Sequence, residues 1–98
     1  MVENNFEQKY QIKWTSQYKK DIKRAKKRNY KMEELEKIVT NIACGIPLEE
    51  KHKDHELEGN WAGHRECHIK PNWLLIYQIK NDVLVLELSR TGTHSDLF

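Results

Sequence analysis

Two apolar segments in the last third of the chain place the strongest limit on its fold. Trp73 to Ile79 is almost entirely apolar, Val83 to Leu88 is a second such segment, and Asn81-Asp82 lies between them as a turn. Apolar segments of this length predict strands at the centre of a sheet. His64 to Lys70, which is followed by Pro71-Asn72, completes a predicted antiparallel β-meander. Such a sheet needs helices to cover it.

Helical patterns occur earlier in the chain. Tyr18, Ile22 and Ala25 recur at spacings of four and three residues, and the segment from Met32 to Ile42 keeps a similar spacing. Phe6 to Trp14 alternates, which predicts a strand over its second half. The predicted fold is therefore α+β, with an N-terminal strand, a two-helix hairpin, an antiparallel β-meander and a short C-terminal tail.

Two features frame the connection between the second helix and the meander. Gly45 is a suitable residue to end the helix. Periodicity is then lost from Leu48 to Gly63, which predicts a long loop. Loops of this length often carry function.

The length and composition agree with one small domain. A chain of 98 residues can bury one core, so residues 1–98 are expected to form a single domain. Hydrophobic residues make up 38% and charged residues 33%, which excludes both a disordered segment and a membrane protein. The first residues are polar and lack the apolar stretch of a secretory signal. We therefore expect a cytoplasmic protein without a membrane partner.

Positive charge is concentrated in the first predicted helix. The net charge is only +2, but ten basic residues and the single acid Asp21 lie between Lys9 and Lys31. This run predicts a polyanionic partner for the N-terminal half. The alternative interpretation is a solvated helix face, which charge runs usually are.

Histidines are unusually frequent. Of the five in the chain, His52, His55, His64 and His68 fall within seventeen positions. Two imidazoles in opposite protonation states can act as base and acid at neutral pH, which suits phosphodiester cleavage by an internal 2'-hydroxyl. His64, Cys67 and His68 are close in sequence, but no second ligand pair at zinc-finger spacing follows and no HExxH motif occurs. We therefore predict neither a metal site nor a cofactor.

Three blocks in the second half of the chain carry a resemblance to a known family. They run from Lys53 to Trp61 (KDHELEGNW), from Arg65 to Tyr77 (RECHIKPNWLLIY) and from Arg90 to Phe98 (RTGTHSDLF). In sequence, spacing and order they resemble the YafQ branch of the RelE superfamily of bacterial toxins. The resemblance implies a RelE-like domain and a ribosome-dependent endoribonuclease that cuts messenger RNA in the A site.

The resemblance also implies partners and site residues. The partners are a cognate antitoxin, the ribosome with its messenger RNA, and operator DNA only through the antitoxin complex. Four residues are expected to be catalytic: His55, His68, Arg90 and His94. Three are expected to bind substrate: Asn72, Trp73 and Phe98. Five residues of the basic helix are expected to contact ribosomal RNA: Lys19, Lys20, Lys23, Arg24 and Lys27.

One position departs from the family pattern. The residue before Trp73 is typically an aspartate in this family, and here it is Asn72. An amide cannot accept a proton as a base, although it can hydrogen-bond a ribose hydroxyl. The base is then His55 or His68, with His94 as the acid. The alternative interpretation is a catalytically weak or inactive toxin-like module that binds nucleic acid or protein.

Overall fold

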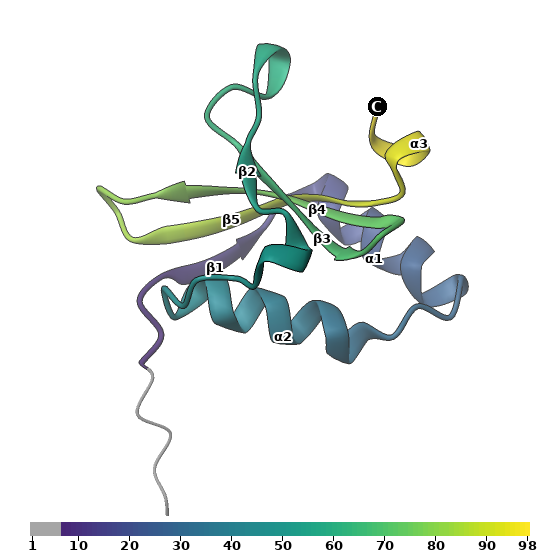
Figure 1. The fold of residues 1–98 in the computed structure, drawn as a ribbon, viewed down its shortest axis with the longest axis horizontal. Coiled ribbons are helices and arrows are strands. Elements are labelled where there is room, and N and C mark those ends of the chain that lie inside the picture. The colour runs from purple at the N-terminus through teal and green to yellow at the C-terminus, as the bar shows by residue number, and fades with distance from the viewer. Residues whose placement is uncertain (1–6) are drawn as a thin grey trace, which may run out of the picture.

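A five-stranded sheet with two helices on one face forms the protein, as the computed structural model shows for residues 7–98 (Figure 1). Phe6, the first residue of the predicted alternating segment, lies outside the described residues. The fold is α+β in the predicted order of strand, two helices and meander. The main elements are β1 (Gln11–Trp14), α1 (Ser16–Lys27), α2 (Met32–Ala43), β2 (His55–Glu56), β3 (Arg65–Lys70), β4 (Trp73–Lys80), β5 (Val85–Gly92) and α3 (His94–Leu97).

The strands follow the order β1-β5-β4-β3-β2 across the sheet. β3, β4 and β5 are antiparallel neighbours, which confirms the predicted meander. β1 pairs with β5 in parallel at one edge, and β2 pairs antiparallel with β3 at the other. β2 lies inside the segment predicted to be a loop, which also contains the short 3-10 turns Glu50–His52 and Gly59–Trp61.

The last strand differs from its predicted range of residues 83–88. It begins at Val85, because Val83 and Leu84 are exposed in the turn and Leu84 has a left-handed backbone with φ of 52°. It continues to Gly92, four residues beyond the predicted end. A β-bulge lies between Leu88, which pairs with Tyr77, and Arg90, which pairs with Ile76.

The helices form where their apolar stripes predict. Thr15 caps α1, because its side chain accepts a hydrogen bond from the Tyr18 backbone N–H. Tyr18 and Ile22 from α1 pack in one core with Leu35 and Ile38 from α2 and the helix-facing side of the sheet. No helix in the described part of the chain is long and apolar enough to cross a membrane.

The opposite face of the sheet is covered only in part. A small cluster of Leu74, Ile76 and Leu97 lies there, with Leu57 and Trp61 packed against it. The β2 loop and α3 stand above this face, on the side of the sheet away from α2 (Figure 1). Trp61 is therefore a residue that packs its loop against the sheet.

Candidate active site

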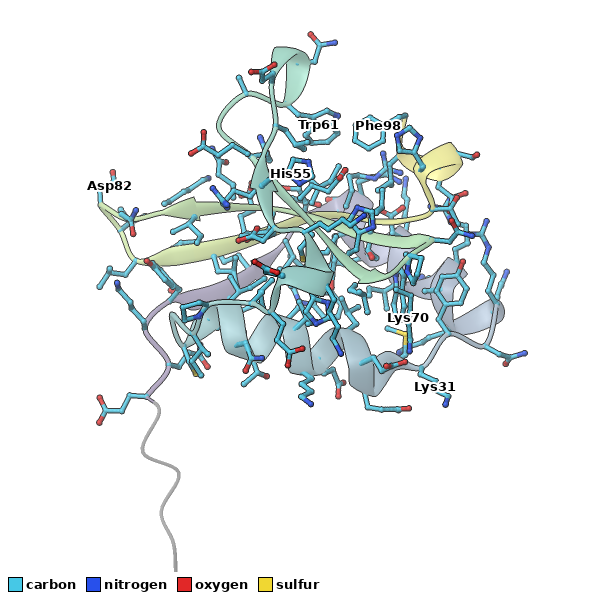
Figure 2. The ribbon with its side chains drawn as sticks, in the orientation of Figure 1. Lys31, His55, Trp61, Lys70, Asp82 and Phe98 are labelled. Carbon is cyan, nitrogen blue, oxygen red and sulfur yellow. The ribbon has the colours of Figure 1, made fainter. Side chains whose placement is uncertain are left out.

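One row of paired residues crosses four strands on the face opposite the helices. His55 in β2 pairs with Glu66 in β3, Glu66 with Ile76 in β4, and Ile76 with Arg90 in β5. His68 pairs with Leu74 and therefore points to the same face. Figure 2 shows His55, Trp61 and Phe98 on this side of the sheet. The fold thus brings together three blocks that are separate in the sequence.

Glu66 lies between two of the predicted catalytic histidines. Its Oε1 is 3.5 Å from His55 Nε2 and 4.0 Å from His68 Nε2, and the residue is only 7% exposed. The other ring nitrogen of His55, Nδ1, is 2.7 Å from the Lys53 carbonyl oxygen. Both nitrogens of His55 therefore face acceptor oxygens. Sequence reasoning missed Glu66, although its position two residues before His68 in a strand places both side chains on one face.

The start of the β2 segment is fixed by a separate polar cluster. The Asp54 carboxylate accepts hydrogen bonds from the Tyr77 hydroxyl and from Arg65. Burial, together with the bond to Asp54, raises the pKa of Tyr77 far above its usual value, so the hydroxyl stays protonated and donates. His52 Nδ1 contacts the His68 carbonyl oxygen at 2.7 Å, which ties the preceding 3-10 turn, Glu50–His52, to β3.

Arg90 is held by a buried carboxylate from α1. Its Nε and Nη2 donate to Asp21 Oδ2 and Oδ1 at 2.8 and 3.2 Å, and the Thr91 N–H donates to Oδ2 at 3.1 Å. The Asp21 side chain is 1% exposed, whereas that of Arg90 is 20% exposed. Glu87 and Asp96, two nearby acids in sequence, pair instead with Lys80 and Arg28. The signal for this role was present, because Asp21 is an acid on the apolar face of a basic helix.

The last helix carries His94. Thr93 and Asp96 form a capping box at its start, and the Phe98 N–H donates to the His94 carbonyl oxygen. The rings of His94 and Phe98 stack with centroids 4.9 Å apart, and Phe98 is 53% exposed. Leu97 anchors the helix on Leu74 and Ile76. These contacts place His94 and Phe98 at the rim of the face that carries Glu66 and His68.

Comparison with known proteins identifies the family. Residues 10–98 match the family described as "Bacterial toxin of type II toxin-antitoxin system, YafQ". The chain belongs to the YafQ toxin family. It is similar to the mRNA interferase toxin YafQ of Escherichia coli K12, with 42% identity over 89% of this chain and 94% of that protein.

Solved structures of YafQ-type toxins share the fold. YafQ in the E. coli DinJ-YafQ toxin-antitoxin complex is similar with a TM-score of 0.83 and 40% identity, over 92% of this chain and 98% of that chain. A metal-bound toxin from Helicobacter pylori is similar with a TM-score of 0.86 and 43% identity, over 91% and 99%. In residues 7–98 of the present YafQ-family chain, no group of three or more His, Cys, Asp or Glu side chains is arranged to hold a metal ion.

Two predicted substrate-binding residues of this YafQ-family protein lie apart from the histidines. Trp73 is 4% exposed, its Nε1–H donates to Thr91 Oγ1 at 2.9 Å, and its ring packs against Tyr30 on the helix side. Trp73 is therefore a core residue. Its contact with an RNA base stays a prediction, and the burial of its ring does not favour that contact. Asn72 is exposed in the β3–β4 turn and lines a cavity with Lys70 and Trp73.

The basic helix divides into free and paired residues. Within the described residues, the four lysines of α1 that we assigned to ribosomal RNA are exposed and form no ion pair: Lys19, Lys20, Lys23 and Lys27. Arg24 differs, because its Nη2 lies 3.2 Å from Asp21 Oδ1 and 3.7 Å from Asp96 Oδ2. In this member of the YafQ family, part of the positive charge that predicted an RNA contact therefore forms ion pairs within the protein.

Proposed function

We propose that this protein is a toxin that cleaves messenger RNA in the ribosomal A site by histidine acid–base catalysis, and that a cognate antitoxin neutralises it. The observation that supports this function most is the single sheet face shared by His55, Glu66, His68 and Arg90, with His94 at its rim. The names of the E. coli relatives, mRNA interferase toxin and DinJ-YafQ complex, support the substrate and the antitoxin partner.

His68 is the better candidate for the general base. Both ring nitrogens of His55 face acceptor oxygens, so His55 is arranged to donate hydrogen bonds rather than to accept a proton. His68 lies two strands from Gly92, which precedes the tail that bears His94, whereas His55 lies one strand further away. His68 would take the proton of the 2'-hydroxyl, and Glu66 would stabilise the imidazolium that forms.

Arg90 and His94 complete the reaction. As the 2'-oxygen attacks the phosphorus and the bond to the 5'-oxygen breaks, the Arg90 guanidinium stabilises the negative charge on the phosphoryl oxygens. His94 gives its proton to the departing 5'-oxygen. The products are a 2',3'-cyclic phosphate and a free 5'-hydroxyl, and Phe98 stacks on an RNA base.

The remaining parts of the proposal concern docking and cofactors. Lys19, Lys20, Lys23 and Lys27 of α1 contact ribosomal RNA. Operator DNA is bound only through the antitoxin complex, and the protein acts in the cytoplasm. The reaction needs no metal, because imidazoles and a guanidinium supply the proton transfers and the positive charge. Purified toxin treated with a chelator should therefore cleave ribosome-bound mRNA as fast as untreated toxin.

His94→Gln tests the mechanism. It should lower ribosome-dependent cleavage by about 10²- to 10⁴-fold, because general acid catalysis contributes on this scale. The mapped cleavage of a defined mRNA on purified ribosomes measures the effect, and thermal unfolding shows whether the variant is folded. Ser95→Ala, next to it in the same helix, is the matched control.

A second candidate function is a toxin-like binding module with little or no activity, and Asn72 is the observation that favours it. Induced expression with and without the cognate antitoxin distinguishes the two. Growth arrest that the antitoxin relieves supports the nuclease. Normal growth together with antitoxin binding supports the module.

A further inference from the structure

An ion pair joins α1 to the last helix. Arg28 Nη1 and Nη2 donate to Asp96 Oδ2 and Oδ1 at 2.6 and 3.1 Å, which is a two-pronged contact between residues 68 positions apart. The guanidinium of Arg28, together with hydrogen bonds from Thr93, holds the pKa of Asp96 well below its usual range. The Asp96 side chain is only 13% exposed. The carboxylate is therefore charged and directed at α1.

The same carboxylate links the two arginines of α1 with the tail. Arg24 Nη2 approaches Asp96 at 3.7 Å and Asp21 at 3.2 Å, and Asp21 in turn holds Arg90. Gly92 makes this close packing possible. A Cβ at that position would lie 2.9 Å from Asp96 Oδ2 and 3.1 Å from Arg24 Nη2.

The last helix cannot hold its own orientation. α3 has four residues, His94–Leu97, and a helix of about one turn is unstable in water by itself. Its contacts with the rest of the protein are the apolar anchor of Leu97 and the ion pairs of Asp96. Leu97 alone fixes one point, and Asp96 is a second fixed point that sets the rotation of the turn.

We propose that Arg28 and Asp96 are positioning residues that set the orientation of His94. The proposal rests on the proposed function, in which His94 is the general acid. Arg28 belongs to the basic run of α1 but acts inside the protein. Its guanidinium keeps α3 rotated so that the stacked rings of His94 and Phe98 stand at the rim of the sheet face that bears His68.

The first measurement concerns structure and needs no substrate. In the full-length protein, Arg28→Gln should reduce the ring-current shift of the His94 imidazole protons, because His94 and Phe98 no longer keep one stacked geometry. The Leu97 and Phe98 amides, which donate to the Thr93 and His94 carbonyl oxygens, should exchange about tenfold faster with solvent. Lys26→Gln removes one positive charge from the same exposed turn and should change neither quantity.

The second measurement concerns cleavage. Arg28→Gln should lower kcat by about 10- to 100-fold with little change in KM, because a small displacement of the acid costs rate rather than binding. Arg28→Lys keeps the charge and should recover part of kcat, and Lys26→Gln should cleave like the unaltered protein.

The outcomes separate this proposal from the proposed function. Unchanged His94 shifts and amide exchange in Arg28→Gln would overturn the positioning role. A rise in KM at constant kcat would also overturn it, because Arg28 would then bind RNA. If the unaltered toxin does not cleave mRNA, the proposed function fails, while loss of the ring-current shift in Arg28→Gln alone would still establish the positioning contact.

Discussion

Two buried carboxylates contact the residues that we propose to be functional and hold them in place. Asp21 fixes Arg90 by two hydrogen bonds, and Glu66 stands between His55 and His68. Buried carboxylates are costly unless they are paired, so each of them is stable only with its basic neighbours in place. The histidines and Arg90 could be proposed from sequence because imidazole and guanidinium chemistry suits phosphodiester cleavage. Asp21 and Glu66 carried only weak local signals, an acid on an apolar helix face and a strand position two residues before His68, because their other partners Arg90 and His55 lie on other elements and become neighbours only in the fold.

Asp21→Asn tests the first carboxylate. The change leaves Arg90 without its anionic partner and Arg24 with only the longer contact to Asp96, so the free energy of unfolding should fall by about 3 kcal/mol, as when one member of a buried ion pair is removed. Urea unfolding followed by tryptophan fluorescence measures this change.

Asp82→Asn is the matched control for Asp21→Asn. Asp82 is exposed in the β4–β5 turn, at the far end of the sheet in Figure 2, and its replacement should alter stability by less than about 0.5 kcal/mol. Equal small effects of the two substitutions would show that Asp21 does not anchor Arg90.

Asn72→Asp tests the departure from the family pattern. The substitution restores the aspartate of the family pattern, and a carboxylate that reaches an imidazolium when RNA is bound stabilises it, so ribosome-dependent cleavage should rise about three- to tenfold or its pH optimum should move upward. The pH profile of cleavage measures both quantities, and Asn60→Asp adds the same charge in the β2–β3 loop as a control. Identical profiles for Asn72→Asp and the unaltered protein would mean that position 72 has no part in proton transfer.

At the scale of elements, the helices were the easiest part to predict. Their apolar stripes and the left-handed Gly45 are local signals that the structure confirms. The end of β5 was not predictable, because a bulge interrupts its alternation and turns Arg90 to the face opposite that of Leu88. β2 has only two residues and forms because β3 is beside it, so its own sequence carries no strand pattern.

The basic face of α1 leads to a prediction at this scale. Reversing Lys20, Lys23 and Lys27 to Glu places like charge against RNA phosphates, so ribosome affinity should fall and its salt dependence should flatten. Sedimentation of the toxin with ribosomes at several salt concentrations measures the effect. Reversal of Lys9, Lys13 and Lys37, outside this helix, changes the net charge equally and should weaken binding much less. Undiminished binding of the α1 variant at physiological salt would show that the run is only a solvated face.

At the scale of the molecule, side chains from the first half of the chain hold candidate functional side chains of the second half in place. α1 packs along the edge of β5 that β1 leaves open, and from there it reaches Arg90 through Asp21 and α3 through Arg28. His68 and His94 come from elements on opposite sides of β4. The candidate site therefore depends on the docking of α1 as well as on the sheet.

The ion pair between Arg28 and Asp96 makes the free energy of unfolding depend on pH in a definite direction. Because Arg28 lowers the pKa of Asp96 in the folded protein, the Asp96 carboxylate stabilises the fold fully above its unfolded pKa of about 3.9, and this stabilisation is lost as the pH falls further. The difference in Tm between the unaltered protein and Asp96→Asn should thus be full at neutral pH and shrink below about pH 4. Thermal unfolding from pH 2 to 7 measures it. A constant difference over this range would contradict the role of the charge.

The ion pair between Arg28 and Asp96 has a consequence for inheritance. Each residue loses most of its structural value without the other, since Asp96 alone would keep its cap and the longer 3.7 Å contact with Arg24, and Arg28 alone would be one more surface cation. In proteins that descend from this one, the residues at positions 28 and 96 should therefore change together, so that both charges are kept or both are lost. Asp21 and Arg90 should not vary in this way, because a change at Asp21 also removes the nearer carboxylate partner of Arg24 and the acceptor of the Thr91 N–H.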